Sequence, residues 1–153
     1  MTPELSVWQH AIPDDVEELL PLLEAFYAEE QLVHDAASVR RAVVDLLADE
    51  SLGGVWLLRV EGVLAGYLVA VLGYSVEFGG RYVLLDELFI SPEFRGGGKW
   101  RHGFREVEAW ARQRGIRTLR LEVNHHNEKA ASLYLADGFS NDERSIFTKR
   151  LGG

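Results

Sequence analysis

Three consecutive glycines at positions 96 to 98 separate a run typical of a buried strand, residues 83–90, from a segment whose apolar residues recur at helical spacing. Glycines leave the backbone N–H groups of a turn unobstructed, and the positive end of a following helix adds to their attraction for anions. The flanking cations are Arg95, Lys99 and Arg101. The pattern predicts a site for a phosphate or pyrophosphate group. It matches neither a Walker A loop nor a Rossmann fingerprint, and a plain structural turn is the alternative.

Two adjacent carboxylates, Asp86 and Glu87, lie in the strand-like run before this turn. Strict alternation along a strand would place them on opposite faces. One face would then hold Leu84, Asp86, Leu88 and Ile90, and the other Leu85, Glu87 and Phe89. Carboxylates so placed can take part in proton transfer, or they can simply be solvated or paired with a cation.

The elements expected around these residues make a mixed α/β domain. Apolar spacing predicts helices at residues 13–31, 36–49, 100–115 and 127–136. Strand patterns occur at residues 5–10, 55–60, 64–72, 83–90 and 117–123, and two further strands are expected between 138 and 151. Pro21 predicts a kink or break in the first helix, and residues 73–81 are expected to form a loop. A chain of 153 residues is too short for two ordinary domains, so we expect one domain of seven strands and four helices.

Composition and charge exclude several classes of protein. Apolar stretches stop well short of the roughly 20 residues that span a membrane, and the absence of cysteine excludes disulfides, a thiol nucleophile and zinc bound by sulfur. No metal site is expected. The net charge of −8 argues against nucleic acid as the main partner. Residues 1–90 carry −12 and residues 91–153 carry +4, which predicts a cationic ligand for the first part and an anionic one for the second.

Two blocks of the sequence resemble the signatures of the GNAT superfamily of N-acetyltransferases. The first block, Leu88-Phe89-Ile90-Ser91-Pro92-Glu93-Phe94-Arg95 followed by the glycines, is similar to the superfamily's strand and Arg-x-x-Gly-x-Gly/Ala loop. The second block matches Asn-x-x-Ala-x-x-Leu-Tyr-x-x-x-Gly-Phe at Asn127, Ala130, Leu133, Tyr134, Gly138 and Phe139. The resemblance implies a mostly antiparallel twisted sheet flanked by helices. It also implies direct transfer of an acetyl group from acetyl-CoA to an amine.

The resemblance assigns chemistry to three residues. Asp86 matches the position of the general base that faces the amine. It would act through a water, because a carboxyl group of pKa about 3.9 is poorly matched to an alkylammonium of pKa about 10.4. Glu87 is the alternate base. Tyr134 matches the tyrosine that protonates the departing thiolate, although an ordinary half-buried aromatic would give the same pattern.

Further residues are implied to bind the two substrates. Those for acetyl-CoA lie at the end of the motif strand, in the glycine loop and at the last helix: Leu88, Phe89, Ile90, Arg95, Gly96, Gly97, Gly98, Lys99, Trp100, Arg101, Asn127 and Tyr134. Carboxylates interleaved with aromatics suit an ammonium ion, so the acceptor is expected at Tyr27, Glu30, Tyr74 and Glu77. A small cationic amine is the first expectation for this acceptor, and a protein N-terminus or lysine the second.

Two positions depart from the superfamily's pattern. Trp100 stands where the loop motif usually ends in glycine or alanine, and Gly103 stands where leucine is common. Helical spacing with Phe104 favours a core position for Trp100. A ring placed over the pyrophosphate site would instead make the chain a catalytically weak acyl-CoA-binding or regulatory module. The superfamily's frequent dimers lead us to expect a homodimer, and the lack of an evident export signal makes the cytoplasm the expected compartment.

Overall fold

The computed structural model describes residues 4–152. The chain divides into two compact units, Met1–Leu121 and Glu122–Gly153, and each is described by itself. That the whole chain forms one domain stays a prediction.

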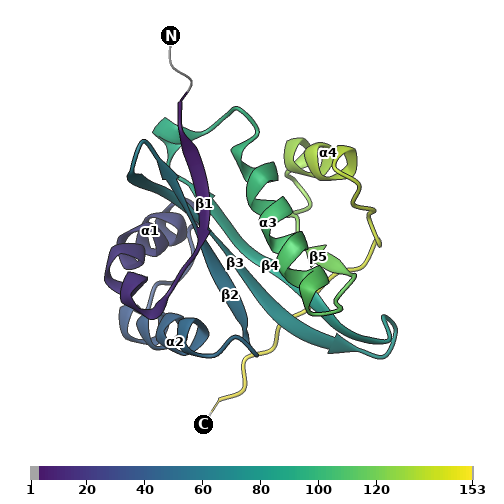
Figure 1. Cartoon of the computed structure of the whole chain (residues 1–153). Helices are drawn as coiled ribbons and strands as arrows, with labels where there is room; N and C mark the ends of the chain where they lie inside the picture. The colour runs from purple at the N-terminus through teal and green to yellow at the C-terminus, as the bar shows by residue number, and fades with distance from the viewer. Residues whose placement is uncertain (1–3, 153) are drawn as a thin grey trace. The chain divides into compact units, whose positions relative to one another are not determined.

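The first unit is built on a five-stranded sheet. Its strands are β1 (Ser6–His10), β2 (Gly53–Val60), β3 (Val63–Ser75), β4 (Gly80–Ile90) and β5 (Leu119–Leu121), and they lie in this order across the sheet (Figure 1). The pairs from β1 to β4 are antiparallel, whereas β5 runs parallel to β4. The expected mixed α/β fold with a mostly antiparallel sheet is confirmed.

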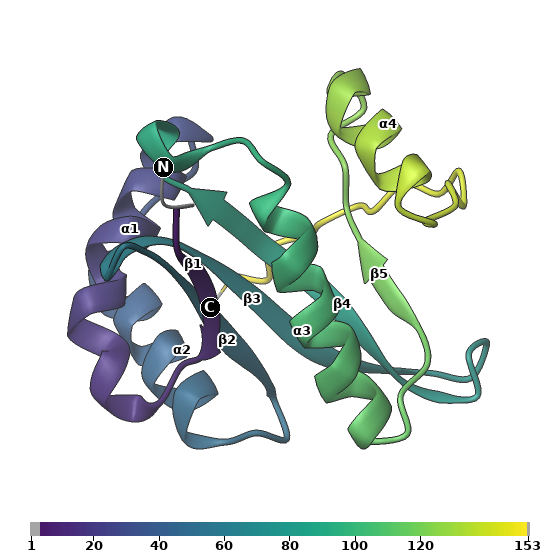
Figure 2. The same ribbon diagram turned by 45° about the horizontal axis from the view of Figure 1, so that its top comes forward.

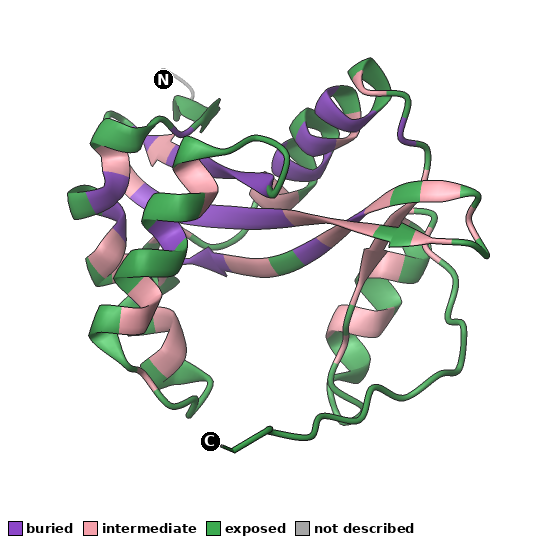
Figure 3. Cartoon of the chain, turned by 90° about the horizontal axis from the view of Figure 1, so that it is seen from below, coloured by how far each residue is buried: buried purple, intermediate pink, exposed green. Residues whose placement is uncertain are grey.

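Helices cover both faces of this sheet (Figure 2). On one face α1 (Val16–Glu29) and α2 (Ala36–Ala48) pack against a core that includes Leu19, Leu23, Val43, Leu57 and Tyr67. On the other face lies α3 (Lys99–Gln113), whose Trp110 ring meets that of Trp56 edge-on at 5.3 Å. Buried residues concentrate in the strands and along α3, whereas the outer end of the β3–β4 hairpin, residues 71–82, is exposed or half-buried (Figure 3).

The unusual glycine of α3 is explained by a tryptophan from β1. A Cβ at Gly103 would lie 2.8 Å from the Trp8 ring, closer than real Cβ atoms come to their neighbours. Trp8 also donates its indole N–H to the carbonyl of Lys99, at 2.8 Å. Trp8 therefore fills the space of a larger residue at position 103 and fixes the first turn of α3, which follows the glycine loop.

Replacing Gly103 with leucine is expected to destabilise the protein by about 1–3 kcal/mol, because the added side chain overlaps the Trp8 ring. Urea denaturation followed by circular dichroism measures this loss. Ala109→Leu, at an exposed position of the same helix, is the control and should stay within about 0.5 kcal/mol of wild type. Equal stabilities of the two variants would contradict the packing of Trp8 on Gly103.

The second unit contains α4 (Glu128–Ala136). Asn127 caps this helix by accepting a hydrogen bond from the N–H of Ala130 at 3.1 Å. The tail after α4 contains no strand as far as Gly152, so the sheet has five strands rather than the seven expected. Apolar spacing alone predicted those strands, and a strand also needs a partner for its backbone groups.

Helix α1 continues through Pro21, so the break expected as one alternative there does not occur; Pro21 is exposed, and its missing N–H frees only one backbone carbonyl. The loop expected at residues 73–81 was wrong. The segment 73–81 is largely strand, because β3 and β4 extend it into a hairpin with its turn at residues 76–79. Within residues 4–152, no helix has the length and apolar character that a membrane crossing requires.

Candidate active site

A bulge in β4 places the two adjacent carboxylates. Along the β3–β4 ladder Glu87 pairs with Val69 and Leu85 pairs with Ala70, so Asp86 has no partner residue. The extra residue breaks the alternation that the sequence predicted. Leu84 therefore shares the α1–α2 face with Glu87 and Phe89, while Leu85 shares the α3 face with Leu88 and Ile90. The predicted grouping of Leu84 with Leu88 and Ile90, and of Leu85 with Glu87 and Phe89, was wrong.

Glu87 is held by two tyrosines. The hydroxyl of Tyr27 in α1 donates to one carboxylate oxygen at 2.8 Å, and the hydroxyl of Tyr67 in β3 donates to the other, also at 2.8 Å. Tyr67 is completely buried. Burial, with the nearby Glu87 carboxylate, raises the pKa of both phenols above the ordinary value, so they remain donors at neutral pH.

Both carboxylates have altered acidity. Burial raises the pKa of Glu87, and the charge of Asp86 adds to this, although the two tyrosine hydrogen bonds act in the opposite direction. Burial also raises the pKa of Asp86. Asp86 lies at the exposed side of the bulge, and no side chain of residues 4–152 donates a hydrogen bond to it. Asp86 is thus the carboxylate with free oxygens, and Glu87 the one fixed in place.

The raised pKa of Glu87 leads to a pH-dependent stability. A carboxyl group that binds its proton more tightly in the folded state adds stability below its unfolded pKa, near 4.5, and loses it as the pH rises through the folded pKa. In Glu87→Gln the side chain at position 87 cannot ionise, so this pH-dependent contribution to the free energy of unfolding is absent. Wild type should therefore lose stability relative to Glu87→Gln as the pH is raised from about 4 to 8. Urea denaturation across this range, with Glu24→Gln as an exposed control, measures the difference; a pH-independent difference would contradict it.

Beyond the bulge, one edge of β4 is open. Strand β5 pairs with β4 only at Val83, Leu84 and Leu85. From Asp86 to Ile90, no strand within residues 4–152 pairs with the edge of β4 that faces away from β3. Backbone N–H and C=O groups on such an edge can bind the amides of an extended ligand. The open edge contains the predicted cofactor residues Leu88, Phe89 and Ile90.

The glycine loop follows this edge and ends at the N-terminus of α3. Gly96, Gly97 and Gly98 have φ angles of +103°, +70° and +69°, which other residues rarely adopt, and Gly98 is the N-cap of the helix. None of residues 4–152 accepts a hydrogen bond from their N–H groups. The loop thus combines donors for an anion with the positive end of a fifteen-residue helix.

Charged and aromatic residues surround the loop. Lys99 forms an ion pair with Glu4 at 3.1 Å, and the guanidinium of Arg101 lies over the Trp100 ring, 4.8 Å from its centre. Trp100 is half-buried, with its ring edge-on to the buried Phe104 at 5.1 Å. The Trp100 ring thus packs on Phe104 as the helical spacing predicted, but Trp100 is not among the buried core residues.

Tyr134 and Asn127 belong to the second unit. Tyr134 is half-buried in α4 beside Phe139, with 6.1 Å between their ring centres, and burial raises the pKa of its phenol. Asn127 accepts the capping hydrogen bond at the start of the same helix. Their roles toward a ligand stay predictions.

The four residues predicted to bind the acceptor do not form one cluster. Tyr27 and Glu30 lie at the end of α1, and Tyr27 bonds Glu87. Tyr74 pairs with Arg81, six residues from Glu87 along β4, which corresponds to about 20 Å at strand spacing. Glu77 lies further out, in the turn of the hairpin, at the end of the sheet remote from α1 (Figure 2). The residue that does accompany Tyr27 is His34, whose ring meets it edge-on at 5.7 Å.

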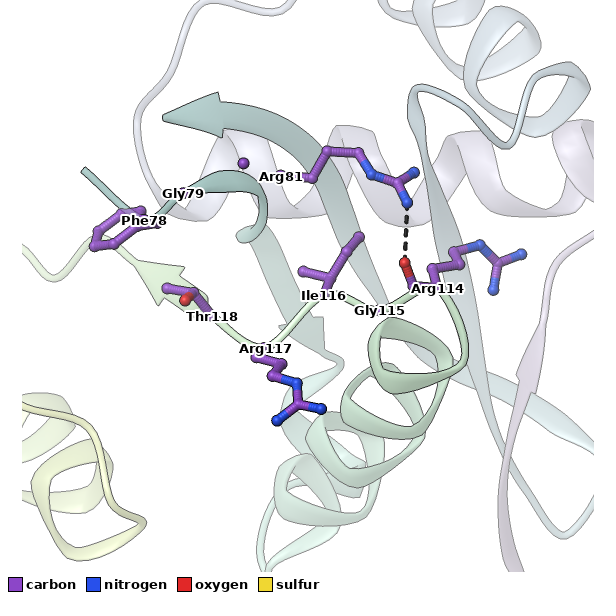
Figure 4. A pocket seen from close by; sticks show the side chains of 9 residues that line it. Phe78, Gly79, Arg81, Arg114, Gly115, Ile116, Arg117 and Thr118 are labelled. Atoms are coloured by element: carbon purple, nitrogen blue, oxygen red, sulfur yellow. Dashed lines mark hydrogen bonds between the residues drawn. The ribbon is translucent and has the colours of Figure 1, made fainter. Parts of the chain in front are cut away.

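The pocket at the end of the sheet remote from α1 is not a candidate active site (Figure 4). It has a volume of about 190 Å³ and is lined by three arginines, at positions 81, 114 and 117. Arg81 donates to the backbone carbonyl of Arg114 at 3.0 Å, and Arg114 pairs with Glu50 at 3.4 Å. Arg117 points away from both in Figure 4. The guanidinium groups diverge, and those of Arg81 and Arg114 bind acceptors of the protein rather than converge on one point.

Sequence reasoning missed Tyr67. A tyrosine inside a buried strand needs an acceptor for its hydroxyl, and this requirement was a usable signal. The acceptor could not be identified from the sequence, because the register of β3 against β4, which brings Glu87 beside Tyr67, is set only in the folded sheet.

Comparisons with known proteins agree with the fold. The model of the family described as "Acetyltransferase (GNAT) family" matches residues 16–139. The N-acetyltransferase YhfO of Bacillus subtilis strain 168 is 36% identical over 62 residues, which are 40% of this chain and 42% of that protein. Thialysine N-epsilon-acetyltransferase of Bos taurus is 33% identical over 75 residues, covering 49% of this chain and 44% of that protein. The matched segments thus span less than half the length of either relative.

Among solved structures, an aminoglycoside N-acetyltransferase in complex with CoA superposes with a TM-score of 0.84. The alignment covers 97% of each chain at 19% sequence identity. At this level of identity the likeness extends to the fold.

Proposed function

The chain belongs to the GNAT family of acetyltransferases, and from this premise we propose that it transfers the acetyl group of acetyl-CoA to a primary amine, with a small cationic amine as acceptor. One observation carries the proposal. A carboxylate with free oxygens on the β4 bulge, an open strand edge and a glycine loop at a helix N-terminus follow one another between Asp86 and Lys99.

The residues present fit acetyl-CoA. The glycine loop offers backbone donors and a helix dipole to the pyrophosphate, with the cations Lys99 and Arg101 at the same helix end. The open edge from Asp86 to Ile90 offers backbone groups to the amides of the pantetheine arm. Bound acetyl-CoA supplies an activated thioester, whose C–S bond breaks as the C–N bond to the amine forms.

Three residues are proposed to accept or donate protons in the reaction: Asp86, Glu87 and Tyr134. An amine attacks only when neutral, so an ammonium must first lose a proton, and Asp86 receives it through a water. Its raised pKa makes it a better acceptor than an ordinary aspartate. Glu87, fixed by Tyr27 and Tyr67, keeps a second carboxylate beside the amine and is the alternate base. Tyr134 returns a proton to the thiolate leaving group.

The acceptor is proposed to bind beside Tyr27 and Glu87. An ammonium group there meets two carboxylates and an aromatic ring, which together favour a cation over a neutral amine. Glu30 lies one helical turn away and adds negative charge at the entrance. The name of the bovine relative, which acts on a cationic amino acid, supports the same class of acceptor.

The test is the acceptor-dependent release of free CoA thiol from acetyl-CoA. A panel of small diamines and cationic amino acids should give turnover, whereas neutral amides of matching size should not. Product mass, increased by one acetyl group on the amine, identifies the reaction. CoA binding without turnover for any amine would favour the alternative of an acyl-CoA-binding module.

A further inference from the structure

The side chain of Arg95, in the loop motif, is directed toward α1. Its Nη2 donates to both carboxylate oxygens of Glu29, at 2.9 and 2.7 Å, and its Nε donates to the carbonyl of Ile90 at 2.7 Å. The guanidinium also lies 5.7 Å from the centre of the Phe89 ring. Arg95 is therefore bound on one side to the last residue of β4 and on the other to the last residue of α1.

Through these contacts the last turn of α1 is connected both to Glu87 and to the glycine loop. Tyr27, two residues before Glu29, holds Glu87, and Phe26 meets the Phe89 ring edge-on at 5.9 Å. Glu29 holds the residue immediately before Gly96. The last turn of α1 thus contacts both the carboxylate beside the acceptor and the start of the glycine loop.

We propose that Glu29 is a positioning residue for acetyl-CoA: through Arg95 it fixes the end of β4 and the start of the glycine loop in the geometry that binds the cofactor. The inference rests on the proposed function, because it concerns the same cofactor site. It also assigns Arg95 a different task from direct contact with phosphate. Its charge is neutralised by Glu29, and its donors are directed to protein acceptors.

The expected loss of CoA affinity comes from disorder of the glycine loop in the free protein, and not from the energy of the ion pair itself. Both side chains are partly exposed, at 45% for Arg95 and 42% for Glu29, so the pair adds little to stability. A loop that is no longer held must be ordered when the ligand binds, which weakens affinity by about 3- to 10-fold. The melting temperature should therefore stay near the wild-type value while CoA affinity falls.

The experiment compares variants of the full chain by calorimetric titration with CoA. Glu29→Gln and Arg95→Gln are each expected to raise the dissociation constant about 3- to 10-fold, and the double variant should be no weaker than the worse single one. Arg95→Lys keeps the charge but lacks the forked donors, so it should behave like Arg95→Gln. Glu24→Gln, an exposed carboxylate on the same helix, is the charge-matched control and should bind as wild type. The acceptor KM at saturating acetyl-CoA should be unchanged in Glu29→Gln.

The possible results separate the inference from the proposed function. Tighter CoA binding by Glu29→Gln would mean that the freed Arg95 reaches the phosphates, and it would overturn the positioning role. So would affinity equal to that of Glu24→Gln, or additive losses in the double variant. Failure of the wild-type protein to bind CoA would remove the proposed function itself, and the inference with it.

Discussion

Asp86→Asn is expected to lower kcat by about 10²-fold or more and to leave the acceptor KM nearly unchanged, if Asp86 is the proposed general base. The amide cannot accept the proton that the ammonium must lose, and general-base catalysis contributes about 10²- to 10⁴-fold. The loss should be partly recovered at high pH, where more of the amine is neutral without help from the enzyme. Steady-state kinetics from about pH 7 to 10, at saturating acetyl-CoA, measure both effects.

Glu30→Gln provides the contrast for this result. Glu30 is exposed at the end of α1. In the proposed function its charge attracts the acceptor but does not take its proton. Neutralising it should mainly raise KM, and the penalty should shrink as salt screens the attraction over a Debye length of about 8 to 10 Å. If Asp86→Asn showed this same salt-dependent change of KM alone, Asp86 would be an anchor for the substrate and Glu87 would become the base.

Tyr134→Phe is expected to lower kcat by about 10²-fold while the affinity for CoA stays within about 2-fold of wild type. The variant loses only a hydroxyl, so the half-buried ring in α4 keeps its packing, but the thiolate loses its proton donor. Burial raises the phenol's pKa, which keeps the hydroxyl protonated at neutral pH. Single-turnover kinetics, with CoA titration calorimetry beside them, separate the chemical step from binding.

Tyr82→Phe serves as the matched control for Tyr134→Phe. Tyr82 lies in β4, where its ring meets Phe78 edge-on at 5.6 Å, toward the hairpin and away from Glu87. Removing its hydroxyl should leave kcat unchanged. A wild-type kcat in Tyr134→Phe would show that another group protonates the leaving thiolate.

The sequence predicted the positions of all five strands and all four helices found in residues 4–152, because each carries the apolar spacing typical of its element. Residues 83–90 needed no partner to be recognised as a strand, and the glycines before α3 marked its start. The tail gave no comparable signal. Its residues 145–151 include types common in strands, such as Ile146, Phe147 and Thr148, but whether they form a strand depends on a neighbouring strand that the sequence pattern cannot supply.

The candidate site was predictable in part. The glycine loop and the pair Asp86 and Glu87 are close together along the chain, so their proximity follows from the sequence alone. The bulge at Asp86, which reverses the faces of Leu84 and Leu85 relative to Glu87, was not predictable, because a bulge adds one residue without any change of composition that could mark it. The contacts of Glu87 with Tyr67 and of Arg95 with Glu29 join residues 20 and 66 positions apart, and only the packed fold determines them.

The half-buried position of Trp100 beside the glycine loop has an optical consequence. Of the four tryptophans, Trp8, Trp56 and Trp110 are 8%, 3% and 6% exposed, so Trp100 is the one that a small collisional quencher can reach. Iodide should be drawn to it by the guanidinium of Arg101 above its ring. A polyanion in the loop would repel iodide and shield the indole, so the quenched fraction of the fluorescence would fall as the loop fills. The unlabelled protein thus contains its own fluorescent reporter of loop occupancy, and titrations need only micromolar amounts of chain.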